Sequence, residues 1–129
     1  MNIAEYNGTS LAYIGDAVMS LYVREMLLEK GFQKPDVLQK KSVAWVSANA
    51  QAYFLMTLKD REFFTEEEWK IVLRGRNTNI SSKAKNATVQ TYRLSTGFEA
   101  LFGYLYLSKQ EERLQELWKA ILEIGEYQK

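Results

Sequence analysis

Two carboxylates lie inside apolar stretches with helical spacing, and this placement restricts how the chain can fold. Asp16 lies within residues 11–18 and Glu99 within residues 96–103, where most neighbours are apolar. A charge on the apolar side of a helix is costly to bury without a partner. Because the two acids are far apart in the sequence, a cation shared between them would compensate both. A fold that satisfies this pattern must bring the two stretches together.

The residue types that the chain lacks narrow its chemistry. None of the 129 residues is His or Cys, which removes His-based catalysis, thiol nucleophiles and zinc sites built on these residues. Carboxylates with a hard metal ion remain the main option. The absence of Cys fits a reducing cytoplasm, and the N-terminus does not read as a secretory signal. No stretch approaches the roughly 20 apolar residues of a membrane helix, so we expect a cytoplasmic protein that does not bind a membrane.

The spacing of apolar residues predicts an all-α fold. We expect one domain over residues 1–129 and no second domain, with one Pro and 7 Gly among 129 residues. Capping boxes are expected at Thr65 with Glu68 and at Ser108 with Glu111. The expected helices run from Thr9 or Ser10 to Gly31, from Pro35 to about Leu58 with a bend at residues 42–47, from Glu66 to about Arg74, from Val89 to Leu107, and from Ser108 to about Glu123.

Basic residues are unevenly distributed, although the net charge is only +1. Residues 69–98 contain six Lys or Arg and no acid, and residues 75–88 within them are polar enough to form an exposed loop. A cluster of this kind can attract phosphates. Ordinary solvated helix faces are the alternative interpretation.

Both acidic motifs carry a family resemblance. Residues 11–18, Leu-Ala-Tyr-Ile-Gly-Asp-Ala-Val, resemble the signature box of the ribonuclease III catalytic domain. Residues 98–107, which begin Phe-Glu-Ala, resemble the second acidic motif of that family. Their order, separation and helical setting also agree. The chain is most similar to the Mini-III branch, which is a ribonuclease III domain without a double-stranded-RNA-binding domain.

The resemblance implies a function and a site. It implies a magnesium-dependent endoribonuclease that cleaves double-stranded or structured RNA, with Asp16 and Glu99 as catalytic metal ligands. It also implies a homodimer in which Tyr13 inserts into the partner subunit. The Mini-III branch is associated with trimming precursors of large-subunit (23S) ribosomal RNA. Whether a ribosomal protein on that substrate is needed stays open.

Two positions depart from the larger family. Ala12 stands where ribonuclease III usually has Glu, and Thr96 stands where it usually has Asp. The number of metal ions is therefore open. We expect a water-rich magnesium site completed by the scissile phosphate, with Thr96 bound to a metal-held water. Gly15 and Gly97, next to or near the acids, indicate close approach of another group.

Contacts to RNA are expected from basic side chains. The candidates are Arg74, Arg76, Lys83, Lys85 and Lys41.

Several alternatives stay open. Asp16 could cap a helix locally while Glu99 pairs with Arg93, and Tyr13 could be a core aromatic. At the level of function, the alternatives are a noncatalytic RNA-binding protein on the same fold and a magnesium-dependent nucleotide pyrophosphohydrolase.

Overall fold

The computed structural model describes residues 2–78 and 87–128, and within them it is all-α. The predicted fold class is therefore confirmed. A short 3-10 helix, Ile3–Glu5, precedes six α-helices. The α-helices are α1 (Gly8–Glu29), α2 (Pro35–Val46), α3 (Ala48–Asp60), α4 (Glu66–Arg76), α5 (Val89–Leu107) and α6 (Glu111–Ile124).

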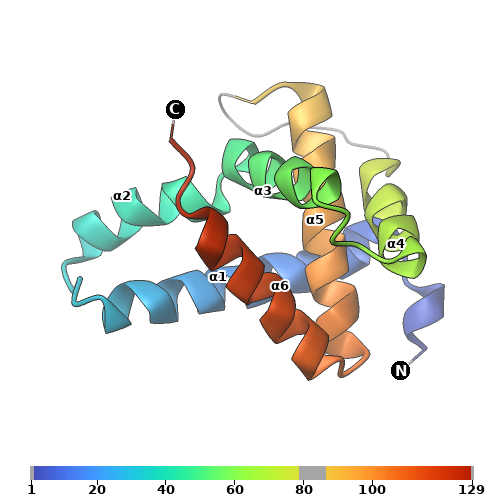
Figure 1. Ribbon diagram of the computed structural model, residues 1–129, viewed down its shortest axis with the longest axis horizontal. Helices are drawn as coiled ribbons and strands as arrows, with labels where there is room; N and C mark the ends of the chain where they lie inside the picture. Colours follow the sequence, from blue (N-terminus) through green and yellow to red (C-terminus); the bar gives the residue numbers. More distant parts are fainter. Residues whose placement is uncertain (1, 79–86, 129) are drawn as a thin grey trace.

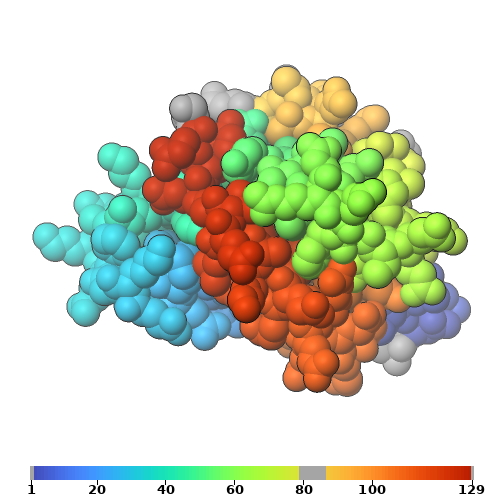
Figure 2. Space-filling view, in the orientation of Figure 1, coloured from blue at the N-terminus to red at the C-terminus, as the bar shows by residue number. Residues whose placement is uncertain are grey.

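Helix α5 is the centre of the molecule and crosses α1 (Figure 1). It packs against α1, α3, α4 and α6. Its apolar residues lie on several sides of the helix, as expected of a helix surrounded by neighbours. Phe98, Leu101, Phe102 and Leu105 are all fully buried or nearly so. Helix α6 and the C-terminal half of α3 lie across the face of the molecule shown in Figure 2.

Main-chain contact through glycines fixes the crossing of α1 and α5. A Cβ atom on Gly15 would collide with the carbonyl oxygen of Glu99, and one on Gly103 would collide with that of Leu11. Gly97 meets the next helix in the same way, because its Cβ would lie 2.6 Å from the carbonyl oxygen of Val72 in α4. The predicted close approach at Gly15 and Gly97 is thus confirmed, and the approaching groups are neighbouring helices. Asp16 and Glu99 flank these contacts.

Helix starts follow local hydrogen bonds, and two of them differ from the prediction. Helix α1 is capped by Asn7, whose side chain accepts from the Ser10 amide at 2.8 Å, and not by Thr9 or Ser10. The capping box of Thr65 and Glu68 is confirmed, with reciprocal bonds of 3.0 and 3.1 Å.

The predicted capping box at Ser108 is wrong. Ser108 instead ends α5, where its hydroxyl donates to the Tyr104 carbonyl at 2.6 Å. Lys109 then adopts a left-handed conformation with φ of 59°, which turns the chain so that Gln110 precedes α6. Helix α6 begins there without a side-chain cap.

The middle of the chain bends as predicted. Ser47 separates α2 from α3, and its hydroxyl accepts from the Ala50 amide at 3.1 Å. The predicted loop at residues 75–88 begins later than expected, because α4 continues to Arg76. Residues 79–86 of that loop lie outside the described residues.

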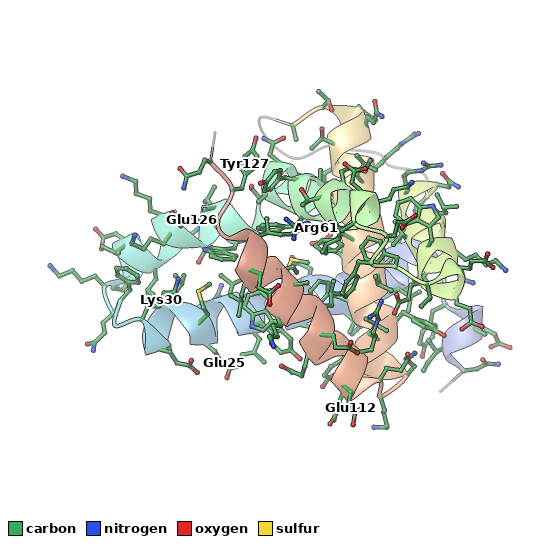
Figure 3. All side chains as sticks on the ribbon, in the orientation of Figure 1. Glu25, Lys30, Arg61, Glu112, Glu126 and Tyr127 are labelled. Atoms are coloured by element: carbon green, nitrogen blue, oxygen red, sulfur yellow. The ribbon has the colours of Figure 1, made fainter. Side chains whose placement is uncertain are left out.

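The C-terminal segment returns to the α2–α3 region. The Tyr127 amide donates to the Ala44 carbonyl at 2.9 Å, and the Tyr127 ring lies 5.5 Å from the Tyr53 ring in α3. Figure 3 labels Tyr127 near the C-terminus. Among the residues that the structure covers, no helix is both long and apolar enough to cross a membrane.

Candidate active site

Asp16 and Glu99 line one cavity of about 390 Å³ formed by α1, α3, α5 and the α2–α3 junction. Asp16 is exposed, whereas Glu99 lies deeper and is only partly exposed. The structure therefore brings together the two predicted metal ligands, one from each side of the glycine crossing. The cavity is lined by Thr9, Ala12, Tyr13, Asp16, Val46, Ala48, Gln51, Tyr92, Ser95, Thr96 and Glu99.

The two carboxyl groups are within hydrogen-bonding reach of each other. Burial raises the pKa of Glu99 most strongly, and the hydrogen bond and negative charge of Asp16 raise it further. A hydrogen bond from Gln51 acts in the opposite direction, and the resulting pKa of Glu99 is about 8. Two adjacent carboxyl groups cannot both ionise cheaply without a nearby cation.

Among the described residues, no Lys or Arg forms an ion pair with Asp16 or Glu99. The ion pairs there join Arg113 to Glu68 and to Glu116, and none reaches Asp16 or Glu99. The alternative in which Glu99 pairs with Arg93 is therefore wrong. As far as the described residues go, the site is a pair of acids without an ion-pair partner, an arrangement that suits an external metal cation.

Gln51 is a site residue that the sequence analysis missed. Its side-chain nitrogen donates to the Val46 carbonyl at 2.9 Å and to Glu99 Oε2 at 3.3 Å. The sequence could have revealed it through helical spacing, because Gln51 is one turn before Phe54 and Leu55 and two turns before Leu58. A polar residue on that apolar stripe of α3 needs a polar partner across the helix interface.

The positions that depart from the larger family also face this cavity. Ala12 and Thr96 both line it, so the two missing carboxylates would have pointed at the same place. The Thr96 hydroxyl donates to the Tyr92 carbonyl at 3.0 Å. Its oxygen lone pairs remain available to accept a hydrogen bond from water. Oxygen ligands with room for water fit magnesium, which keeps several waters when bound to proteins.

Comparison with known proteins agrees with this geometry. The model of the Ribonuclease III domain family matches residues 9–110, which include both acids. The chain belongs to the ribonuclease III family. A Mini-ribonuclease 3 from Streptococcus pneumoniae is 50% identical over 86% of this chain and 87% of that protein. One from Enterococcus faecalis is 47% identical over 95% of this chain and 93% of that protein.

A solved structure extends the similarity to the fold. A crystal structure of a Fusobacterium nucleatum protein superposes with a TM-score of 0.83 at 30% identity, covering 92% of this chain and 95% of that chain. Together with the Mini-ribonuclease 3 relatives, this places the chain in the Mini-III branch of the ribonuclease III family. Its activity class is therefore that of a ribonuclease-type endonuclease.

The side chains predicted to contact RNA are spread over two parts of this ribonuclease III fold. Arg74 and Arg76 lie in the last turn of α4, and Lys41 lies in α2, on the other side of the α1–α5 crossing (Figure 1). Arg74 donates to the Tyr6 carbonyl at 3.2 Å, and the Lys41 ammonium lies 4.4 Å from the centre of the Phe32 ring. Lys83 and Lys85 lie outside the described residues.

Tyr13 projects from α1 into solvent. Its side chain is 79% exposed, so the alternative in which it is a core aromatic is wrong. Tyr13 also lines a second cavity of about 420 Å³, next to Tyr6, Ile14 and Leu107. A large exposed aromatic beside an apolar hollow is a feature of protein interfaces.

Proposed function

We propose that this ribonuclease III domain is a magnesium-dependent endoribonuclease that cleaves double-stranded RNA. The supporting observation is the pair formed by Asp16 and Glu99, which lack an internal counter-charge within the described residues. We propose that both carboxylates hold Mg²⁺. When bound, the ion supplies an activated water and charge relief at phosphorus during phosphodiester hydrolysis.

The residues around the acids suit this chemistry. Glu99 is held from behind by Gln51, and Asp16 is exposed at the mouth of the cavity, where a phosphate can approach. Thr96 lies one turn from Glu99 and can accept a hydrogen bond from a water of the metal shell. With only two carboxylates, the site is expected to bind metal weakly until a scissile phosphate adds its own oxygens.

We propose a homodimer as the active form, with Tyr13 at its interface. The support is the 79% exposure of Tyr13 beside an apolar hollow. A twofold dimer presents two sites to one duplex, so that each subunit cuts one strand. A-form RNA offers phosphates and 2′-hydroxyl groups across its shallow groove, so shape and charge are expected to dominate recognition.

We propose the precursor of 23S ribosomal RNA as the substrate, because the chain resembles the Mini-III branch, which is associated with trimming that RNA. Arg74, Arg76, Lys83, Lys85 and Lys41 are proposed to contact its phosphates. Replacing Arg76 and Lys41 with Gln is expected to weaken binding across RNA sequences and to reduce the salt dependence of the dissociation constant. An unchanged salt slope would remove these two residues from the interface.

The function is tested by cleavage assays with the purified protein and an Asp16→Asn variant. Both are incubated with a long RNA duplex and with precursor ribosomal RNA, with and without Mg²⁺. We expect magnesium-dependent cutting that disappears in the variant, while its thermal unfolding stays close to that of the unmodified protein. If Asp16→Asn still cuts RNA, Asp16 is not part of the active site. RNA binding without cutting on every substrate would support the noncatalytic alternative.

A further inference from the structure

We infer that Gln51 is a positioning residue for Glu99: its side-chain amide fixes one oxygen of that carboxylate and leaves the other free for the metal. This inference rests on the proposed function, because it concerns the carboxylate that we propose as a metal ligand. It adds a third side chain, from a third helix, to a site that otherwise consists of one acid from α1 and one from α5.

The hydrogen bonds of Gln51 define the orientation of its amide. A carbonyl oxygen can only accept, so the Val46 contact at 2.9 Å requires the nitrogen of the amide on that side. The same nitrogen has a second hydrogen, which reaches Glu99 Oε2 at 3.3 Å. Both hydrogens are therefore used, one on the main chain of α2 and one on the carboxylate of α5.

The burial of Gln51 is costly, and fold stability alone does not explain it. The residue is 2% exposed. Its Oε1 atom is buried and has no hydrogen-bond partner in the described part of the chain. An orphaned buried acceptor destabilises a fold, and an apolar side chain of similar shape would avoid that cost but would also remove the donor to the Val46 carbonyl. Gln51 also shares its face of α3 with the buried Phe54 and Leu55, where an apolar side chain would fit.

The contact with Val46 ties Glu99 to the break between α2 and α3. Val46 is the last residue of α2, where carbonyl groups lack partners within the helix. The Gln51 amide satisfies that carbonyl and at the same time holds Glu99 Oε2. Val46, Gln51 and Glu99 all line the cavity that contains Asp16. The rotamer of Glu99 is thus set by the main chain of a helix that carries neither acid.

Metal binding by the RNA-free protein tests the inference. Mn²⁺ serves as the probe, and electron paramagnetic resonance reports its free concentration. The key variant is Gln51→Met, which keeps the volume of the side chain and removes both hydrogen bonds. We expect it to bind Mn²⁺ about 10-fold more weakly. For duplex RNA at saturating metal, we expect kcat to fall while KM for RNA stays within about twofold.

Two further variants separate positioning from general destabilisation. Leu58→Val removes a buried methylene group from the same helix, two turns from Gln51. We expect it to lower the melting temperature without changing Mn²⁺ affinity. Gln51→Asn keeps the amide on a shorter stem that cannot reach both partners, and we expect it to bind Mn²⁺ as weakly as Gln51→Met. In a Glu99→Gln background, Gln51→Met should have no further effect on Mn²⁺ binding, because the amide acts through Glu99.

The outcomes distinguish the inference from the proposed function. If neither Mn²⁺ binding by the RNA-free protein nor cleavage of duplex RNA is weakened by Glu99→Gln, the proposed function fails, and the inference fails with it. If that binding is present and Gln51→Met retains full Mn²⁺ affinity, the inference alone is overturned. Equal loss of Mn²⁺ affinity in Leu58→Val would likewise overturn it, because the effect would then be one of stability.

Discussion

Glu68 and Glu99 are two glutamates removed from solvent in the same small fold, and their surroundings are opposite. Burial alone would raise the pKa of Glu68, but hydrogen bonds from Arg113 and Thr65 outweigh it and hold that pKa below its usual value. Arg113 contacts both carboxylate oxygens, at 2.7 and 2.8 Å. Glu99 has Asp16 as its charged neighbour, and its pKa rises to about 8.

The comparison separates an acid whose charge the chain compensates from the acid that we propose as a metal ligand. Glu68 closes a contact between α4 and α6 and also caps α4 through Thr65. Its charge is fully compensated by the chain itself. Glu99 is held by Gln51, but no ion pair reaches it within residues 2–78 and 87–128, which is why we propose that a metal cation completes the site. Both residues are glutamates, and burial raises the pKa of each, but the neighbouring charge is positive at Glu68 and negative at Glu99.

The largest expected effect comes from neutralising Glu99, the proposed metal ligand. Glu99→Gln should lower the rate of RNA cleavage by about 10³-fold or more, because the metal loses a charged ligand. The fold should remain intact, since a Gln side chain can still accept from Gln51 and can donate to Asp16. Cleavage of duplex RNA and circular dichroism of the same sample check the two parts. A variant that cleaves at near-normal rate would remove the distinction between the two acids.

Breaking the structural pair should act on stability instead. Arg113→Met leaves Glu68 without its cation and should destabilise the fold by about 2–3 kcal/mol, less than a fully buried pair because Arg113 is partly exposed. Urea unfolding measures this change. At a temperature where the variant is folded, RNA cleavage should stay within about threefold of normal. A large loss of cleavage there would mean that Glu68 also serves the active site.

The two acids should also give stability a pH dependence of opposite sign. The folded-state pKa of Glu99 is above its unfolded value of about 4.5, so the folded state holds the extra proton between pH 4.5 and 8. Metal-free stability should therefore fall as pH rises through this window. For Glu68 the folded-state pKa is lowered, so its stabilisation is present above pH 4.5 and is lost on further acidification.

Urea unfolding of the metal-free protein across this pH range measures both effects. Because the cavity is open to water, we expect the Glu99 contribution to be on the order of 1–2 kcal/mol between pH 5 and 8. In the Glu99→Gln variant, the free energy of unfolding should no longer fall between about pH 5 and 8. It should still fall on acidification below about pH 4.5, because of Glu68. If the stability of Glu99→Gln depended on pH as the unmodified protein does, this pH dependence would not come from Glu99.

The smallest expected effect comes from adding an acid to the site. Thr96→Asp places a carboxylate one turn from Glu99, facing the same cavity. It should tighten Mg²⁺ binding by a few-fold, because a third oxygen ligand strengthens the site, while it lowers metal-free stability by about 0.5–1 kcal/mol through like-charge repulsion. Isothermal titration with Mg²⁺ and thermal unfolding in a chelator measure the two changes. Unchanged Mg²⁺ affinity would show that residue 96 does not face the ion.

The sequence predicted the all-α fold and the acids that share a site, because both depend on patterns along the chain. Residues 89–107 were predicted as one helix and form one, since their apolar spacing and Thr88 cap are local signals. Ser108 misled the prediction because a Ser–x–x–Glu pattern does not reveal that its hydroxyl bonds backward to Tyr104. The role of Gln51 depends on a contact with Glu99, 48 residues away, which no local pattern contains.

The glycine crossing of α1 and α5 has a consequence for how such a site tolerates change. At Gly15 and Gly103, main chain meets main chain, so no side chain acts as a spacer between the helices that carry the two acids. Core residues elsewhere do not set the distance between these two helices directly. Any residue larger than glycine at either position would push α1 and α5 apart and so increase the distance between Asp16 and Glu99. A designer who transplants this site should copy the helix crossing first and the acids second.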